Sequence, residues 1–350
     1  MKIKQFLYFS LLILAVLFFA CDKDNPVVPP EPEPGPDTAS RYKWKTIDYL
    51  YNSLYTIYVA DTNMIYVRIW TSIAYLQDSS LYPYNLYDQK FKVVSINGYD
   101  RNNFFISGYT LVNGHRFPTI KKVTNGAVST TILDSAFADA SDILVEGPNQ
   151  AWICTYYNNL VFHYDNGNVT KYKLSDDDTI YTARLYKSPT NEIFAFATKV
   201  TTYLPGYHYT YKLVGDTFVN TKIGCYSPYD KECLTDFIYR CGPDLLMIHP
   251  FSKEVRYFNG TDWVHHSYCE GGGAKIGGIS KDSLVAFLYP LGNIYTYNGK
   301  VWRKERTSPL ILPLGLNVHS NIEAKFGNIY FAHADTESEW GKIFIGKPNK

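Results

Sequence analysis

Apolar and polar residues alternate along most of the chain after residue 41, in short runs that end at turn-forming residues. Val161 to Asp165 and Val169 to Leu174, for example, alternate with a period of two on either side of Asn166 and Gly167. This period is typical of β-strands that bury one face. Asn-Gly accepts the positive φ angles of a tight hairpin turn. The pattern therefore predicts pairs of antiparallel strands and shows no helical period.

A second short phrase recurs seven times and sets the length of a repeat. It consists of a turn-forming residue followed by an apolar run, as in Asp61 to Val67 and Gly147 to Ile153. The turn residues lie 38 to 54 positions apart and are Asn63, Asn102, Asn149, Thr190, Asp244, Asp282 and Asn328. Repeats of this length with four short strands are typical of β-propeller blades. We predict an all-β propeller of seven blades, with six as the alternative, in one domain over residues 41–350.

The last repeat contains only three predicted strands. The segment 42–47 resembles a fourth strand but stands alone before the first repeat. We therefore predict that it pairs beside residues 341–346 and closes the ring, which removes an exposed sheet edge. Trp263 and Trp302 open the fourth strands of their repeats, and we expect their indoles to wedge between neighbouring blades.

The N-terminus predicts export. Lys2 and Lys4 precede an apolar run from Phe6 to Ala20, which is typical of a cleaved signal over residues 1–20. Residues 21–40 contain six prolines and predict an extended, semi-rigid linker.

The stretch from Leu17 to Cys21 resembles the lipobox of bacterial lipoproteins. The resemblance implies that Cys21 is acylated and that the protein is anchored in the bacterial cell envelope, at the outer membrane or the cell surface. An ordinary secretory signal followed by an unrelated cysteine is the alternative.

Charge and composition narrow the choice of partners. The chain has 34 Lys and Arg against 33 Asp and Glu, and removal of Lys2 and Lys4 with the signal leaves 32 against 33. A nearly neutral chain without a basic stripe argues against nucleic acid as a partner. Tyrosine is abundant, with 32 residues, and suits both strands and wet binding surfaces because it combines an apolar ring with a polar tip.

The chain has six cysteines, and an exported protein lies in a compartment that permits disulfides. Cys225 and Cys233 flank a short segment between the fourth and fifth repeats, so we predict a local disulfide between them. Cys154 and Cys241 fall within predicted strands, so we expect buried free thiols.

The repeated phrase is similar to that of the short-blade propellers of bacterial sensor ectodomains, whose units carry an Asp-x-x-Gly-Asn-Leu-Trp-like motif. The resemblance covers the seven turn phrases and implies the propeller fold. The Gly-Thr that ends the motif in that family is missing here, so a complete sensing role does not follow. Residues Asn259 to Trp263 also occupy the place of the Asp-box turn of sialidases, whose role is structural.

The sequence contains few candidates for catalysis or metal binding. Asp176, Asp177 and Asp178 fall in a connection between blades and are interpreted as a solvated charge run rather than a carboxylate pair for acid–base catalysis or a calcium loop. The alternating oxygens and the glycine of a calcium loop are missing. His265 and His266 are adjacent on a strand, point to opposite faces and do not chelate one metal ion. No cofactor is predicted.

One face of the propeller is predicted to carry longer, aromatic connections. They span residues 72–87, 109–117, 156–159, 201–209 and 225–233. Because binding groups are often carried on loops above a rigid scaffold, we predict that binding residues gather there around the mouth of the central channel. They are Tyr82, Tyr84, Arg116, Tyr157, Tyr203, Tyr207, Tyr226 and Tyr229.

Two functions fit these observations. The first is a non-catalytic recognition module that binds a glycan or an envelope protein through the tyrosine-rich face. The second is an enzyme acting on polysaccharide, a glycoside hydrolase or lyase, with carboxylates near the channel mouth such as Glu146, Asp236 or Asp335. A purely structural lipoprotein is the remaining alternative.

Overall fold

A computed structural model describes most of the chain after residue 41. The described residues are 42–49, 54–86, 88–135, 138–156, 158–177, 179–199, 207–224, 238–248, 253–269, 274–288, 293–305, 318–335 and 341–348. The predicted signal, Cys21 and the proline-rich linker lie outside them. Among the described residues, no helix is long and apolar enough to cross a membrane.

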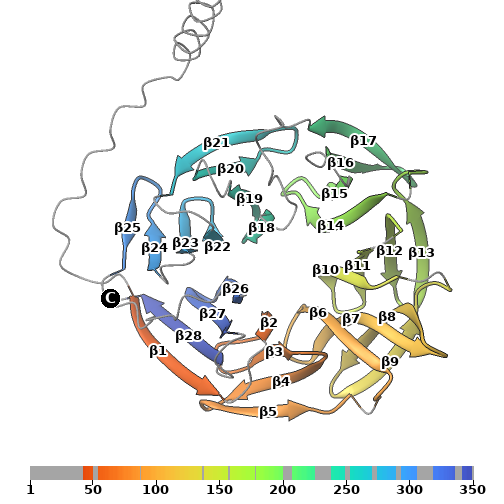
Figure 1. Ribbon diagram of the computed structural model, residues 1–350, viewed down its shortest axis with the longest axis horizontal. Coiled ribbons are helices and arrows are strands. Elements are labelled where there is room, and N and C mark those ends of the chain that lie inside the picture. Colours follow the sequence, from red (N-terminus) through yellow and green to blue (C-terminus); the bar gives the residue numbers. More distant parts are fainter. Residues whose placement is uncertain are drawn as a thin grey trace, which may run out of the picture. The chain divides into compact units, whose positions relative to one another are not determined.

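The strands form seven four-stranded antiparallel sheets arranged as a ring (Figure 1), so the predicted seven-bladed β-propeller is confirmed. Blade 1 contains β2 (Leu54–Val59), β3 (Ile65–Ile69), β4 (Ser72–Gln77) and β5 (Ser80–Tyr84). Blade 2 contains β6 (Phe91–Gly98), β7 (Asn103–Val112), β8 (His115–Thr124) and β9 (Ala127–Ile132). Blade 3 contains β10 (Ala140–Gly147), β11 (Gln150–Thr155), β12 (Leu160–Asp165) and β13 (Asn168–Lys173).

The remaining blades repeat this order. Blade 4 contains β14 (Ile180–Lys187), β15 (Ile193–Lys199), β16 (Tyr207–Val214) and β17 (Thr217–Gly224). Blade 5 contains β18 (Ile238–Cys241), β19 (Asp244–Ile248), β20 (Glu254–Phe258) and β21 (Trp263–Tyr268). Blade 6 contains β22 (Ala274–Ser280), β23 (Ser283–Leu288), β24 (Asn293–Tyr297) and β25 (Trp302–Lys304). Blade 7 contains β26 (Val318–Lys325), β27 (Asn328–Asp335), β28 (Gly341–Pro348) and, as its outermost strand, β1 (Tyr42–Tyr49).

The N-terminal strand closes the ring, as the sequence predicts. β1 pairs with β28 from Tyr42 opposite Pro348 to Tyr49 opposite Gly341. Trp44 lies opposite Gly346, and a Cβ atom at Gly346 would meet the indole at 2.9 Å. The missing side chain of Gly346 therefore makes room for Trp44, which fixes the register of the closing strand.

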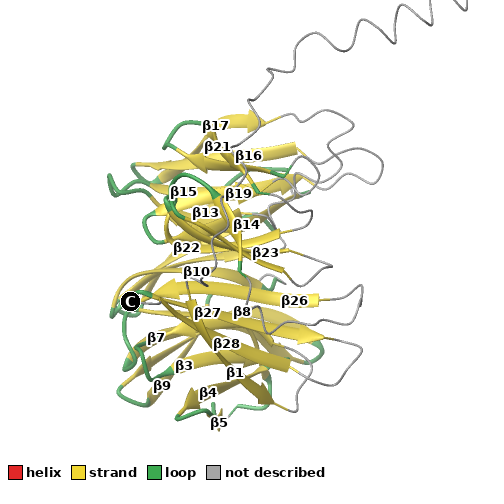
Figure 2. Cartoon of the chain, turned by 90° about the vertical axis from the view of Figure 1, so that its left-hand side faces the viewer, coloured by secondary structure: helices red, strands yellow, loops and turns green. Residues whose placement is uncertain are grey.

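The strands of each blade run between two faces of the ring (Figure 2). The turn face carries the turns between the first and second strands and between the third and fourth strands. Asn125 and Gly126 form one such turn, with φ angles of 49° and 83°, as their sequence predicts. The loop face carries the turns between the second and third strands and the connections from each blade to the next.

Two of the predicted long connections are wrong. Residues 72–87 contain β4 and β5, joined to β3 by a short turn at Trp70 and Thr71. Residues 109–117 belong to β7 and β8, whose short turn is formed by Asn113 and Gly114. The aromatic residues of both segments therefore lie mainly on strands, because the turns that join these strands are short.

Aromatic side chains pack the blades against each other. The indole of Trp302 in blade 6 is buried and donates to Ser267 Oγ of blade 5 over 3.0 Å. Trp263 of blade 5 packs within 5.8 Å of Phe196 of blade 4, measured between ring centroids. Both tryptophans thus lie between neighbouring blades, as predicted.

Candidate functional site

The loop face exposes an indole over blade 1. Trp70 is 57% exposed and has a φ angle of 53°, a conformation that bulky residues rarely adopt. Arg68 holds this turn, since its Nε donates to Trp70 O over 2.7 Å and its Nη1 reaches Val94 O of blade 2 over 2.7 Å. A tight hairpin turn requires this conformation, and a bulky residue keeps it here because Arg68 and blade 2 support the turn.

The loop face also exposes side chains over blades 2 and 3. Arg116 is exposed at the start of β8, and its guanidinium carbon lies 4.7 Å above the ring of Tyr109. Its Nη1 donates to Asp139 Oδ2 of the next connection over 2.9 Å, and Tyr156 N donates to Asp139 O over 2.8 Å. Tyr156 is 47% exposed. We call Trp70, Tyr109, Arg116 and Tyr156 the rim residues.

The structure places the predicted binding residues on several elements. Arg116 is one of the rim residues, and Tyr207 begins β16, which starts at the loop face. Tyr82 and Tyr84 lie on β5, the outermost strand of blade 1, and not at the centre of the ring (Figure 1). The others lie outside the described residues and are Tyr157, Tyr203, Tyr226 and Tyr229.

A row of tyrosines crosses blade 1 from its innermost to its outermost strand. Tyr58, Tyr66, Tyr75 and Tyr82 are opposite one another in register on β2, β3, β4 and β5. Tyr82, 45% exposed, stacks on Tyr75 with 5.4 Å between ring centroids. Burial raises the pKa of Tyr66 to about 12 and also raises that of Tyr84. These hydroxyls therefore stay protonated at neutral pH.

Phe104 of blade 2 packs against this row. Its ring centroid lies 4.5 Å from that of Tyr66 and 5.8 Å from that of Tyr84. Tyr84 thus fills the contact between blades 1 and 2, whereas Tyr82 turns part of its ring to solvent.

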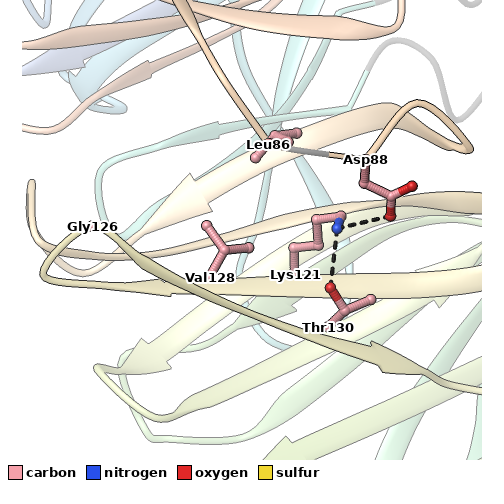
Figure 3. A pocket seen from close by; sticks show the side chains of 6 residues that line it. All are labelled: Leu86, Asp88, Lys121, Gly126, Val128 and Thr130. Carbon is pink, nitrogen blue, oxygen red and sulfur yellow. Dashed lines mark hydrogen bonds and ion pairs between the residues drawn. The ribbon is translucent and has the colours of Figure 1, made fainter.

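A cavity of about 400 Å³ lies beside this contact (Figure 3). Its lining residues come from the connection between blades 1 and 2 and from the two outer strands of blade 2, and they are Leu86, Asp88, Lys121, Gly126, Val128 and Thr130. The Lys121 side chain is 3% exposed, and its Nζ lies 3.0 Å from Asp88 Oδ2 and 3.0 Å from Thr130 Oγ1. A buried ammonium is costly unless it is paired, so this ion pair stands out among the described residues.

Sequence reasoning missed both Trp70 and Lys121. The sequence does contain an indication for Lys121. Side chains along a strand point alternately to its two sides, so Thr119, Lys121 and Val123 share one side of β8. A lysine at such an inward position indicates a buried charge. Its partner Asp88 comes from a connection, and no spacing predicts that contact.

Charged side chains near the centre of the ring link the first strands of different blades. Arg240 of blade 5 donates through Nη2 to Asp142 Oδ1 of blade 3 over 2.6 Å, and Asp142 Oδ2 accepts from Leu185 N of blade 4 over 3.0 Å. Glu323 Oε2 of blade 7 accepts from Val59 N of blade 1 over 2.8 Å. Burial raises the pKa of Glu323 to about 7, against the lowering effect of Lys325 and the hydrogen bond from Val59.

The carboxylates proposed for catalysis do not meet among the described residues. Glu146 lies near the turn-face end of β10, where its Oε2 accepts from Trp152 Nε1 over 2.6 Å and its Oε1 from Lys187 Nζ over 2.5 Å. Asp335 ends β27 at the loop face, and Asp236 lies outside the described residues. Glu146 therefore serves the packing of blades 3 and 4, away from the loop face.

The other candidate groups have structural surroundings. His265 contacts Glu254, whereas His266 contacts Lys281 O, which confirms that the two rings diverge. Asp177 accepts from the backbone and side chain of Thr179 within its connection. In the part of the chain that the structure describes, no group of three His, Cys, Asp or Glu residues is placed to hold a metal ion.

The predicted free thiols are confirmed. Cys154 and Cys241 are buried and free, and burial raises the pKa of the Cys154 thiol to about 12. Cys225 and Cys233 lie outside the described residues, so their disulfide stays a prediction.

No family model and no curated protein sequence matches the chain. Solved structures share its fold at low identity. Virginiamycin B lyase from Staphylococcus aureus is 12% identical, with a TM-score of 0.61 over 86% of this chain and 99% of the lyase. YCF48 bound to D1 peptide is 13% identical, with a TM-score of 0.60 over 87% of this chain and 97% of YCF48.

A sensor protein is among the similar structures. The extracellular domain of the putative hybrid two-component system BT3049 from B. thetaiotaomicron is 13% identical, with a TM-score of 0.53 over 84% of this chain and 40% of that chain. The sequence resembles sensor ectodomains only in its turn phrases, whereas the similarity to the BT3049 domain covers the fold. At such identities the common property is the propeller fold.

Proposed function

We propose that this protein is a non-catalytic recognition module of the bacterial cell envelope that binds a glycan or an envelope protein through its loop face. The observation that carries the proposal is the exposed Trp70, held in a left-handed conformation on the face that also exposes Arg116 of blade 2 and Tyr156 of blade 3. Aromatic rings and guanidinium groups are enriched at binding hot spots. The peptide complex of YCF48 supports the proposal, since a propeller of similar fold has a peptide partner.

Recognition fits the charged groups better than catalysis on polysaccharide does. The described carboxylates near the centre of the ring accept hydrogen bonds from other blades, as Asp142 does from Leu185 N and Glu323 from Val59 N. A general acid or base must instead reach the atom that it protonates or deprotonates. These groups are better suited to holding the scaffold on which the rim residues stand.

Substitution of the rim residues tests this proposal. Full-length protein is assayed on a glycan array and against purified envelope proteins, together with its Trp70→Ala and Arg116→Ala variants. We expect each variant to lose roughly tenfold or more in affinity for the ligand of the wild type, as hot-spot residues do.

Tyr99→Ala is the matched control, since Tyr99 is 58% exposed in a turn of the turn face and should bind as the wild type does. The proposal is wrong if both rim variants keep wild-type affinity, or if Tyr99→Ala alone loses it.

The proposal includes a lipid anchor at Cys21, at the outer membrane or the cell surface. Its support is the lipobox-like stretch and the linker over residues 21–40. In cells grown with an alkyne-tagged fatty acid, the wild type should be labelled and found in the membrane fraction. The Cys21→Ser variant should carry no label and should be absent from the membrane fraction. Labelling of Cys21→Ser equal to that of the wild type would contradict the anchor.

A further inference from the structure

The cavity between blades 1 and 2 shares no residue with the rim and has its own chemistry. We propose that it is a saccharide-binding site, in which Lys121, Asp88 and Thr130 bind neighbouring hydroxyl groups of a ligand of one or two sugar rings (Figure 3). This inference goes beyond the recognition function of the loop face and does not depend on it.

The polar groups of the cavity have hydrogen-bonding capacity left over. An ammonium has three N–H donors. Lys121 directs two of them to Asp88 and Thr130, and its Nζ also lies 5.0 Å from the centroid of the Phe91 ring, a cation–π contact that gives the third N–H no oxygen acceptor. Thr130 accepts from Lys121 through Oγ1, so its own O–H remains a donor. The Asp88 carboxylate accepts from Lys121 and from the backbone N–H groups of Lys90 and Phe91, which leaves about one of its four acceptor positions.

Donors and an acceptor side by side favour a neutral polyhydroxy ligand. The Lys121 ammonium is neutralised by Asp88 at 3.0 Å, and a phosphate or carboxylate ligand would face the Asp88 carboxylate as a like charge. A sugar hydroxyl both donates and accepts, so adjacent hydroxyls match the N–H of Lys121, the O–H of Thr130 and the oxygen of Asp88. The ion pair therefore selects against anions.

The apolar lining and the size of the cavity agree with this ligand class. Leu86 and Val128 are partly buried and pack against the apolar cluster that joins blades 1 and 2, and their side chains line the cavity beside the polar groups. They are suited to contact with the C–H groups of a sugar ring. The volume of about 400 Å³ falls in the range of small-molecule sites, roughly 300–1,000 Å³.

Packing alone does not require the ion pair. The rest of this contact is apolar, including Phe104, Ile106 and Val123. A methionine in place of Lys121 would fill the same space without the cost of burying an ammonium. Ligand binding therefore accounts for the buried Lys121 ammonium, which packing alone does not explain.

Calorimetric titration tests the site. Full-length protein, in a detergent without a sugar headgroup, is titrated with methyl glycosides of hexoses and N-acetylhexosamines, with disaccharides, and with inorganic phosphate and acetate. We expect at least one saccharide to bind, and Thr130→Val and Lys121→Met to weaken it by roughly tenfold. Phosphate and acetate should neither bind nor compete.

Two controls make the outcome decisive. Thr131→Val changes the next residue of β9, whose side chain points to the other side of the strand, and should bind as the wild type does. If Lys121→Met lowers the melting temperature, the result for Thr130→Val decides, because Thr130 is exposed on β9 and its substitution leaves the apolar packing in place. The proposal is overturned if no saccharide binds, if an anion binds in its place, or if Thr130→Val and Thr131→Val have equal affinity.

Trp70→Ala separates this site from the loop face. It should leave saccharide titration of the cavity unchanged even where it abolishes binding at the rim. A loss of cavity binding in Trp70→Ala, with Thr130→Val unaffected, would move the saccharide to the rim and overturn the inference.

Discussion

Single charged residues hold the first strands of the ring together, and Glu323 of blade 7 is one of them. Its carboxylate accepts from Val59 N, and Lys325 Nζ donates to Val59 O over 2.8 Å. Blade 7 is thereby joined to blade 1 through their innermost strands. Burial raises the pKa of Glu323 from its ordinary value of 4.5 to about 7, so the protonated acid is the form that the folded state favours.

The sign of this shift predicts how stability depends on pH. The contribution of a group whose pKa rises on folding is fully present below the unfolded value, here 4.5, and is lost as pH rises through about 7. Glu323→Gln keeps an acceptor for Val59 N and cannot ionise. Its melting temperature relative to the wild type should therefore increase between pH 5 and pH 8, by a free-energy difference on the order of 2 kcal/mol.

Thermal unfolding of both proteins across this range measures the effect. Glu192→Gln serves as the control, because hydrogen bonds from Lys212 and Thr190 lower the pKa of Glu192 and so place its own titration below this range. A difference between Glu323→Gln and the wild type that stays flat from pH 5 to pH 8 would contradict the prediction.

At the scale of elements, the sequence predicts turns well where glycine or asparagine marks them. Asn166 and Gly167 have φ angles of 50° and 93°, and alternation on both sides identifies the two strands. The turn of blade 1 between β4 and β5 has Asp78 and Ser79 at 49° and 72°, without a glycine. Such turns depend on the pairing of the strands around them and cannot be recognised from local composition. For this reason residues 72–87 are wrongly predicted to be one long connection.

The same limit explains why the candidate sites were only partly predictable. Arg116 could be placed on the loop face from the order of strands alone. Trp70 adopts its left-handed conformation because Arg68 and blade 2 hold it, and Lys121 has its partner on a connection between blades. Contacts between blades have no fixed spacing in the sequence, whereas contacts within a blade follow the period of the strand.

At the scale of the whole molecule, the ring depends on one pairing between the two ends of the described chain. The other six blades are each built from consecutive strands, and only blade 7 joins β1 to β26, β27 and β28. Closure of this kind removes both sheet edges that an open array would expose. A covalent bond between β1 and β28 should therefore stabilise every blade together.

The exposed pair Lys43 and Lys347 offers a place for that bond. They lie opposite each other in the antiparallel register, and opposite Cα atoms of such strands are about 4.5–5.5 Å apart, within the range that a disulfide spans. Lys43→Cys combined with Lys347→Cys should form a disulfide. Because the closed loop contains nearly the whole propeller, the disulfide should stabilise the folded state by about 4 kcal/mol or more in the chain-entropy model.

Unfolding in guanidinium under oxidising conditions should show one cooperative transition at a higher midpoint, which returns to the wild-type value on reduction. The single variants should unfold as the wild type does with or without reductant. If the oxidised double variant keeps the wild-type midpoint although mass spectrometry shows the bond, opening between β1 and β28 is not part of the unfolding reaction, and the ring is held by its other contacts.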